Sequence, residues 1–198
     1  MAVIRDIVFS GPEDTIHVLD AGPYGSYHTA AFDGNGLVQV FTREGTFLRQ
    51  FSVNEVEPGE KNKPGRMAMD KAGNYFISQP VLGEVWKFDA KGALAARIPY
   101  PDAYALASCA RAGKNMIAVA ARLPRHKASE KPEVAFIDAA TGKIAQTVKL
   151  AVPIPQCISI AVDSKSNIFV LSAETAQCFK FSPQGQLVAA LGREREDR

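Results

Sequence analysis

"MDKAGNYFISQPVLGEVWKF", residues 69–88, indicates three short strands in succession, separated by a Gly-Asn turn and a second short break. A meander of three strands leaves an unpaired edge on each side and is marginally stable in water. The stretch therefore needs a neighbour to pack against, and the rest of the sequence indicates what that neighbour is.

The same pattern returns near the C-terminus. "IAVDSKSNIFVLSAETAQCFKFSPQGQLVAALG", residues 160–192, repeats the order of "MAMDKAGNYFISQPVLGEVWKFDAKGALAARI", residues 67–98. A first strand, an Asp-containing turn, two alternating strands and a Gly turn follow one another in both copies. The matched positions are Asp70 with Asp163, Gly73-Asn74 with Ser166-Asn167, Trp86-Lys87-Phe88 with Phe179-Lys180-Phe181, and Gly92 with Gly185.

Two weaker copies complete the set. One combines residues 7–20 with 38–51, and the other combines residues 105–121 with 134–150. The turn glycines of the four copies are separated by 47, 50 and 43 residues, which is the blade period of a β-propeller. We therefore predict an all-β fold with four four-stranded antiparallel blades, about 4–51, 66–98, 105–150 and 157–192, forming a single propeller domain over 1–192 with a charged tail at 193–198.

The Asp, Gly-Asn, apolar strand, aromatic-Lys-Phe-Asp and Gly-turn order resembles the NHL repeat, while "FIDAATGKI" in the third copy is similar to the YVTN-type repeat. The resemblance implies a propeller, and NHL propellers usually have about six blades. Four blades leave three arrangements open: a closed four-blade ring, two chains pairing into a larger ring, or an arc whose open faces another protein covers. An uncovered blade face would expose a large apolar patch.

Composition is that of a globular protein. The chain has 198 residues, 46% hydrophobic and 22% charged, with a net charge of +2 that does not favour nucleic acid as a partner. The first residues contain no secretion signal and no membrane span, and the three cysteines have no disulfide or zinc spacing. We predict a soluble cytoplasmic protein without a membrane partner.

Blades differ mainly in loop length. Long insertions are expected at 21–36, 52–66 and 122–133, with shorter Pro-rich joins at 99–104 and 151–156. In the family that the chain resembles, these loops open on one face, and loops on a rigid scaffold commonly carry binding residues. The predicted partner is another protein chain or a second copy, with RNA or an unbound solvated loop as alternatives. The candidate binding residues are Tyr24, Tyr27 and His28, and a basic cluster of Arg122, Arg125, His126 and Lys127.

No catalytic constellation is found. His17 lies in the alternating strand "TIHVLD" and is interpreted as structural, Trp86 as a core residue, and Asp70 and Asp163 as turn residues. HExxH, GxSxG, P-loop and CxxC motifs do not occur. No catalytic residue, metal or cofactor is predicted. The predicted function is a non-catalytic scaffold for protein–protein interaction, an accessory subunit of a larger assembly; a metal-dependent propeller enzyme of lyase or lactonase type and an RNA-binding NHL domain are the alternatives.

Overall fold

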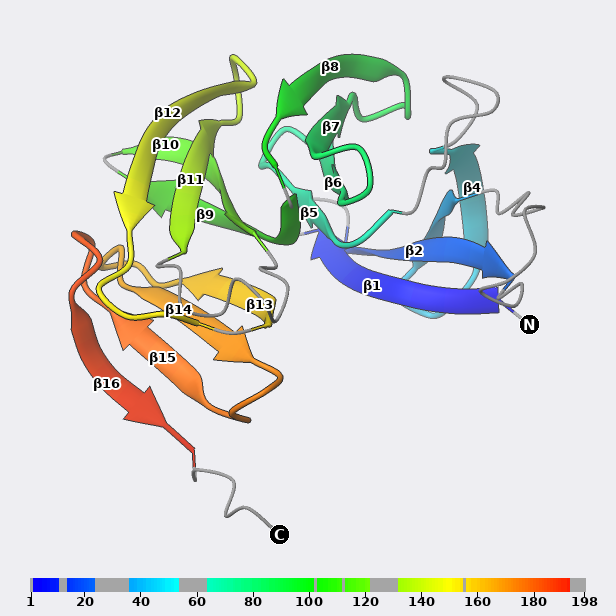
Figure 1. Ribbon diagram of the computed structural model, residues 1–198. Coiled ribbons are helices and arrows are strands. Elements are labelled where there is room, and N and C mark those ends of the chain that lie inside the picture. The colour runs from blue at the N-terminus through cyan, green and yellow to red at the C-terminus, as the bar shows by residue number, and fades with distance from the viewer. Residues whose placement is uncertain are drawn as a thin grey trace, which may run out of the picture. The chain divides into compact units, whose positions relative to one another are not determined.

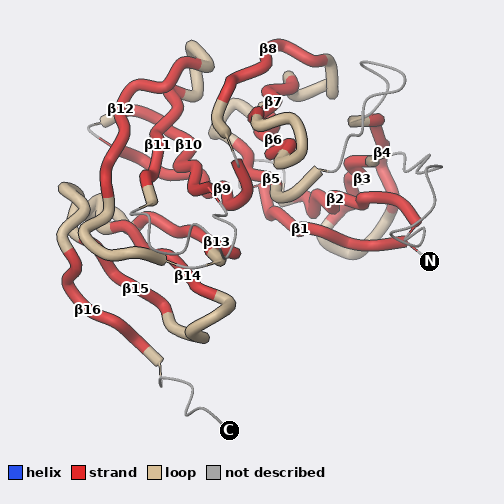
Figure 2. Tube along the Cα trace, in the orientation of Figure 1, coloured by secondary structure: helices blue, strands red, loops and turns tan. Residues whose placement is uncertain are grey.

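The computed structural model describes residues 2–10, 14–23, 36–53, 64–101, 103–111, 113–121, 132–154 and 156–192. All regular structure in these residues is β-strand, sixteen strands in total. Figures 1 and 2 draw the described residues as strands and loops without a helix. The strands form four separate four-stranded antiparallel sheets. The predicted all-β class and the predicted four-by-four arrangement are therefore confirmed.

The chain divides into two compact units, Met1–Pro99 and Tyr100–Arg198, each with two sheets. In unit 1, sheet 1 contains β1 (Ala2–Ser10), β2 (Thr15–Pro23), β3 (Leu37–Thr42) and β4 (Phe47–Ser52), and sheet 2 contains β5 (Met67–Met69), β6 (Tyr75–Gln79), β7 (Glu84–Phe88) and β8 (Leu94–Pro99). In unit 2, sheet 3 contains β9 (Ala103–Arg111), β10 (Lys114–Ala121), β11 (Glu133–Asp138) and β12 (Lys143–Lys149), and sheet 4 contains β13 (Cys157–Val162), β14 (Ile168–Ser172), β15 (Cys178–Phe181) and β16 (Leu187–Leu191).

Each sheet is a simple meander, because its strands pair in chain order. The turn between β7 and β8 is closed by backbone hydrogen bonds between Asp89 and Ala93 and between Gly92 and Asp89. The Asp89 carboxylate accepts two further hydrogen bonds, from the backbone N–H groups of Lys91 and Ala93. These bonds hold the pKa of Asp89 below its usual value, the Ala93 N–H making the largest contribution.

The outer strand of sheet 1 departs from the strict alternation that its sequence predicts. Val40 of β3 pairs with Arg49, whereas the next residue, Phe41, pairs with Phe47, so Leu48 is the extra residue of a bulge. Phe47 and Leu48 are consequently both exposed. A strictly alternating strand would place Phe47 on the same face as Arg49 and Phe51, whereas the bulge shifts the side-chain alternation by one residue and places Phe47 on the opposite face.

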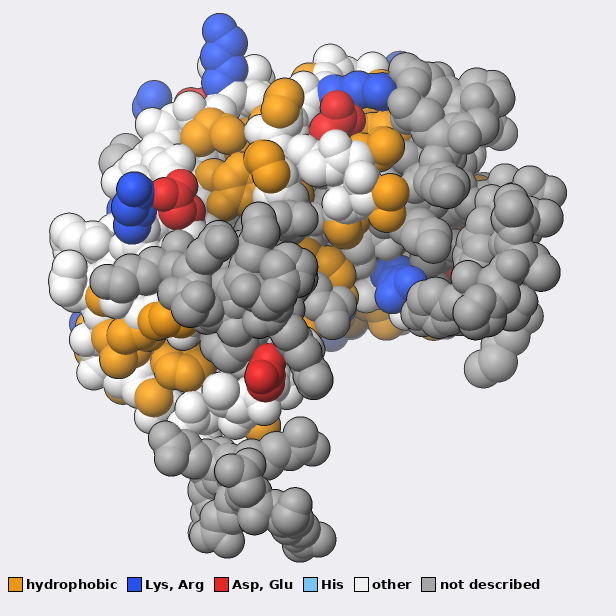
Figure 3. All heavy atoms as spheres, viewed as in Figure 1, with side chains coloured by type: hydrophobic (Ala, Val, Ile, Leu, Met, Phe, Trp, Pro, Cys, Tyr) orange, Lys and Arg blue, Asp and Glu red, His pale blue; other side chains and the backbone are white. Residues whose placement is uncertain are grey.

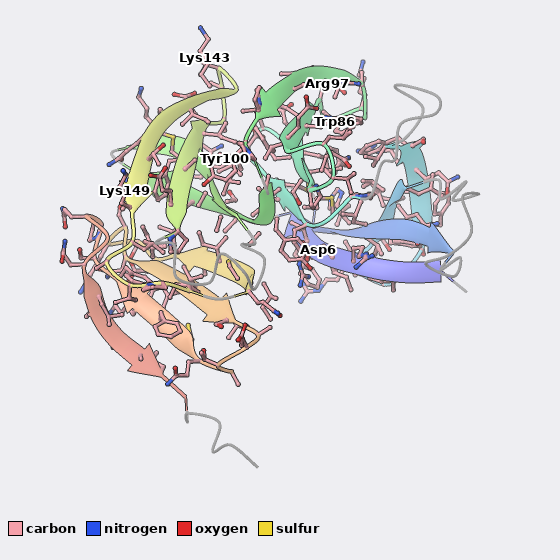
Figure 4. All side chains as sticks on the ribbon, viewed as in Figure 1. Asp6, Trp86, Arg97, Tyr100, Lys143 and Lys149 are labelled. Atoms are coloured by element: carbon pink, nitrogen blue, oxygen red, sulfur yellow. The ribbon has the colours of Figure 1, made fainter. Side chains whose placement is uncertain are left out.

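Each unit has its own apolar core between its two sheets. In unit 1, Leu19, Val38 and Val40 of sheet 1 pack with residues of sheet 2, including Trp86, which is fully buried as predicted. The guanidinium of Arg97 lies 4.5 Å from the Trp86 ring, and Figure 4 shows the two side chains on adjacent strands. In unit 2, the core joins sheet 3 to sheet 4, and its largest members are Phe136, Phe181, Leu150, Ile154 and Ile168.

Candidate interaction faces of sheets 1 and 4

The seven loop residues that the sequence singles out lie outside the described residues, so their role stays a prediction. The described part of β2 ends at Pro23 and the described part of β10 at Ala121, immediately before the two loops that carry them. The residues concerned are Tyr24, Tyr27, His28, Arg122, Arg125, His126 and Lys127.

Within each unit, the first sheet packs on the second, and we call this contact a junction. We call the face of the first sheet that packs on the second sheet its forward face, and the packed face of the second sheet its backward face. The opposite face of each sheet takes the other name. In unit 1, the forward face of sheet 1 covers the backward face of sheet 2. In unit 2, the forward face of sheet 3 covers the backward face of sheet 4.

Aromatic packing and a buried polar chain connect the sheets of unit 1. Phe51 of β4 contacts Tyr75 of β6 edge-on, with 4.9 Å between ring centroids. The Tyr75 hydroxyl lies 3.1 Å from Nδ1 of His17, and the Nε2 of His17 lies 2.9 Å from the Thr15 hydroxyl. Arg49 donates to the Tyr75 hydroxyl and to the carbonyl of Ala90. His17 is therefore buried and hydrogen-bonded within the core, as the sequence interpretation holds.

An arginine of a different strand, Arg111 at the end of β9, makes a similar connection in unit 2. The Arg111 guanidinium lies 4.3 Å from the Phe136 ring and donates to the Gln146 side chain at 2.9 Å. It also crosses to sheet 4, where it donates to the carbonyls of Pro183 at 2.7 Å and Ser166 at 3.4 Å. Both units thus use an arginine of one sheet to bind carbonyl groups in the turns of the following sheet.

A more specific contact recurs at both junctions, between an outer strand and a turn glycine. The side chain of Phe51 lies so close to Gly92 that a Cβ at Gly92 would clash with it. In unit 2, a Cβ at Gly185 would clash with the backbone of Lys149 and lie 2.9 Å from the Val148 side chain. Phe51 and Val148 each follow the turn glycine of their own sheet by six residues, so they are equivalent positions of the repeat.

The backward face of sheet 1 also carries a row of apolar side chains, but two of these side chains are exposed. Phe9, Ile16, Phe41 and Phe47 are partners across the four strands, and the rings of Phe41 and Phe47 are in edge-on contact. Phe9 is 72% exposed and Phe47 is 52% exposed. The turn glycine beside them, Gly45, has no described atom within 4 Å of its Cβ position. Within the described structure, the neighbour that packs on Gly92 and Gly185 therefore has no counterpart at Gly45.

In sheets 2 and 4, the face that corresponds to the backward face of sheet 1 packs against another sheet. Their equivalent rows face the preceding sheet of the same unit, and every member except Leu187, which is 42% exposed, belongs to or packs against the apolar cores. The equivalent rows are Met69, Tyr75, Phe88 and Leu94 in sheet 2, and Val162, Ile168, Phe181 and Leu187 in sheet 4.

The forward face of sheet 4 is exposed in a similar way. Ser159, Leu171, Cys178 and Leu191 are partners across its four strands, and Leu191 is 51% exposed. Leu191 follows Gly185 by six residues, so it is the repeat equivalent of Phe51 and Val148. Figure 3 shows hydrophobic side chains gathered over the part of sheet 4 formed by β14 to β16. The row in sheet 3 that corresponds to it is buried: Ala105, Ala120, Val134 and Val148.

The repeated aspartates shape turns. Asp163 accepts hydrogen bonds from the backbone N–H groups of Lys165 and Asn167 and from the Asn167 side chain. The Asn167 side chain is the first cause that holds the pKa of Asp163 below its usual value. Asp70 makes the same set of bonds with Ala72 and Asn74. The predicted turn role of both residues is confirmed, and among the described residues no group of three or more His, Cys, Asp or Glu could hold a metal ion.

The three cysteines differ in burial. Cys109 and Cys157 are buried free thiols, as predicted, and burial raises the pKa of Cys109 to about 11. Cys178 is half-buried on the forward face of sheet 4. It is thus the accessible thiol among the three.

Comparison with known proteins places the chain among β-propellers. It is similar to a protein of unknown function from Bacteroides caccae, with a TM-score of 0.70 and 11% identity over 97% of this chain and 68% of that one. It is also similar to a catalytically inactive virginiamycin B lyase from Staphylococcus aureus with quinupristin (TM-score 0.64, 10% identity, 94% of this chain and 55% of that one). A third similar structure is the Dos1 propeller (TM-score 0.61, 12% identity, 100% of this chain and 49% of that one). No protein-family model matches, and neither does any curated protein.

The class of protein is therefore a β-propeller in which each four-stranded sheet is one blade. The chain spans about half the length of two of the propellers that it matches. Within the described part of the chain, no apolar helix reaches membrane-spanning length. The sequence interpretation left open an arc with uncovered blade faces but named no residue on them, although Phe9 and Leu191 occupy repeat positions whose equivalents Met69 and Val148 are core residues.

Proposed function

We propose that this chain is a non-catalytic β-propeller scaffold that mediates protein–protein contacts as an accessory subunit of a larger assembly. The observation that carries the proposal is the exposure of two apolar faces, the backward face of sheet 1 and the forward face of sheet 4. Phe9 and Phe47 on the first face, and Leu171 and Leu191 on the second, are among the large hydrophobic side chains that are exposed in the described residues. Exposed apolar patches of this extent commonly mark protein contact sites.

The repeat favours a binding role for these exposed residues over exposure that has no function. Phe9, Phe47 and Leu191 occupy the positions that form sheet-to-sheet contacts elsewhere in the same chain. An interface made of such residues resembles a section through a domain core, which is typical of stable complexes. The NHL-type assignment of the repeats belongs to this proposal too, and the paired Asp-Asn turns at Asp70 and Asp163 support it.

The test is affinity capture from the natural source with the tagged wild-type chain and three variants of it. Phe9→Glu and Leu191→Glu place a charge on one face each, and Val81→Glu is the control at a 55% exposed residue in the turn after β6. The proposal expects one stoichiometric partner with wild-type and Val81→Glu protein, lost with Phe9→Glu or Leu191→Glu. Equal capture by all four proteins would rule out these faces as the contact site.

A metal-dependent propeller enzyme is the second candidate, because one of the similar structures is a lyase. It predicts a tightly held divalent ion. Equilibrium dialysis against Mg²⁺ or Mn²⁺, followed by metal analysis, tests it: one retained equivalent per chain would favour the enzyme, and stoichiometric capture through Phe9 or Leu191 without retained metal would favour the scaffold.

A further inference from the structure

We propose that the forward face of sheet 4 in one copy of the chain docks on the backward face of sheet 1 in a second copy. This inference rests on the proposed function and names the partner of the two exposed faces. It extends the contact that the chain already makes twice, between sheets 1 and 2 and between sheets 3 and 4, to one more junction of the same kind.

The donor side of this junction is Leu191. At the existing junctions, the residue six positions after the turn glycine packs on the turn glycine of the next sheet: Phe51 on Gly92, and Val148 on Gly185. Leu191 is the same repeat position in sheet 4 and remains exposed. Leu171 and Cys178 continue its row across the sheet, and the next row of the same face carries Lys180, whose ammonium group lies 5.4 Å from the Phe169 ring centroid.

The acceptor side is Gly45 with the row of Phe9, Ile16, Phe41 and Phe47. Gly45 has a φ of +87°, close to the +93° of Gly92 and the +83° of Gly185, so its turn has the same shape as the two turns that are already in contact. Among the described residues, none occupies the space over Gly45. A leucine from another sheet fits there in the way that Phe51 and Val148 fit over the other two glycines.

One chain therefore presents both halves of a junction, a donor with Leu191 and an acceptor with Gly45. Contacts between two different faces of identical chains are head-to-tail, and two of them join two chains into a ring when the rotation closes. Two copies supply eight sheets, which lies inside the range of about four to eight blades known for propellers. The chain covers 55% and 49% of two propellers that it matches, so a second copy brings the total close to the size of those chains.

Cross-linking identifies the partner. In a Cys178→Ser background, Leu191→Cys and Thr46→Cys are placed on separate chains that carry different tags, and a short bis-maleimide joins thiols that are close. Thr46 is exposed and adjoins Gly45. The proposal expects a covalent dimer with both tags from the mixture, and a light-scattering mass near twice 21.4 kDa for the wild-type chain. Val81→Cys in place of Thr46→Cys is the control and should give no such dimer.

The effect of substitution completes the test. Leu191→Glu and Phe9→Glu should each weaken self-association by roughly tenfold or more, since a few anchor residues near the centre of an interface dominate binding. Val81→Glu should leave the mass unchanged, and thermal unfolding checks that each variant is folded.

The outcomes separate the two proposals. A link formed inside one chain that carries both substitutions, unaffected by dilution, would overturn this junction and the protein-binding function together, because the two faces would then cover each other. A monomeric Leu191→Cys chain whose introduced thiol reacts freely with maleimide and forms no dimer would overturn only the second copy as the occupant. Stoichiometric capture of another protein, lost with Leu191→Glu, would in that case still support the proposed function.

Discussion

The hydroxyl of Tyr75 on sheet 2 lies 3.1 Å from Nδ1 of His17 on sheet 1 and 2.9 Å from the Arg49 guanidinium that donates to it. Since Arg49 uses an acceptor site of the hydroxyl, the hydroxyl proton is available for Nδ1 of His17. In the tautomer with the ring proton on Nε2, Nδ1 accepts from Tyr75 and Nε2 donates to the Thr15 hydroxyl; in the other tautomer both directions reverse. One hydroxyl thus connects two strands of sheet 1 to sheet 2 inside an apolar core.

Tyr75→Phe removes this hydroxyl and should lower the free energy of unfolding by about 1–3 kcal/mol, because a buried imidazole nitrogen and an arginine lose a partner together. Tyr100→Phe is the matched control, since the Tyr100 hydroxyl donates to a backbone carbonyl, that of Glu133. Urea denaturation of both variants measures the difference. A loss for Tyr75→Phe no larger than that for Tyr100→Phe would contradict the role of the hydroxyl as a shared link.

Gly92→Ala and Gly45→Ala separate backbone strain from packing. Both glycines have positive φ, so alanine costs about 1–2 kcal/mol at either position. At Gly92 the new Cβ also clashes with Phe51, whereas at Gly45 it meets no described atom. We expect Gly92→Ala to be more destabilising than Gly45→Ala by about 1–3 kcal/mol, which is typical of overpacking. Equal losses in denaturant titrations at concentrations that keep the chain monomeric would refute the close contact at Gly92.

Ser166→Gly should stabilise the protein by up to about 1 kcal/mol, because glycine removes the cost of a left-handed backbone. Ser166 has a φ of +64°, in the region that a side chain disfavours, and Gly73 holds the equivalent place in sheet 2 with a φ of +83°. The reverse change, Gly73→Ser, should destabilise by a similar amount. Thermal melts of both variants test this, and a lower melting temperature for Ser166→Gly would show that the serine side chain contributes more than its strain costs.

The repeat makes much of the fold predictable from sequence. Asp70 and Asp163 lie at the same turn in two copies, and the structure gives both carboxylates the same bonds. Trp86 aligns with Phe179, which indicates a core position, and the structure buries the indole completely. Such positions are predictable because each depends on its own turn or strand and on the period of the repeat.

Features that depend on what lies beside a sheet could not be predicted in this way. Phe9 has the apolar character of its buried equivalent Met69, and Leu191 that of Val148, yet both are exposed. The local sequence determines which face of a strand is apolar, but the number of neighbouring sheets determines whether that face is covered. The bulge at Leu48 was missed for a related reason, since a register shift depends on two strands together.

Asp163 should make stability depend on pH in the acid range. Its pKa is held below the usual value in the folded chain, first by the Asn167 side chain, so the unfolded carboxyl binds protons more readily than the folded one. The stabilisation is therefore present above the unfolded pKa, near 3.8, and is lost as the pH falls through the folded pKa. Asp163→Asn should destabilise the protein at pH 6 and have less effect at pH 3. A difference between wild type and variant that does not shrink toward pH 3 would contradict this linkage.

Gln79→Met should raise the free energy of unfolding by about 1–2 kcal/mol, because it removes a buried amide that has no compensating bond among the described residues. Gln79 at the end of β6 is fully buried, and within the described structure neither its Nε2 nor its Oε1 has a hydrogen-bond partner. Methionine has a similar length and fills the same space without a polar group. Ser78→Ala is the contrasting variant, since the Ser78 hydroxyl accepts a hydrogen bond from the Arg66 backbone at 2.8 Å, and its loss should destabilise. Denaturant titration of the two variants gives opposite signs if the Gln79 amide is unsatisfied, and a destabilised Gln79→Met protein would mean that this amide is bound by a partner that stabilises the fold.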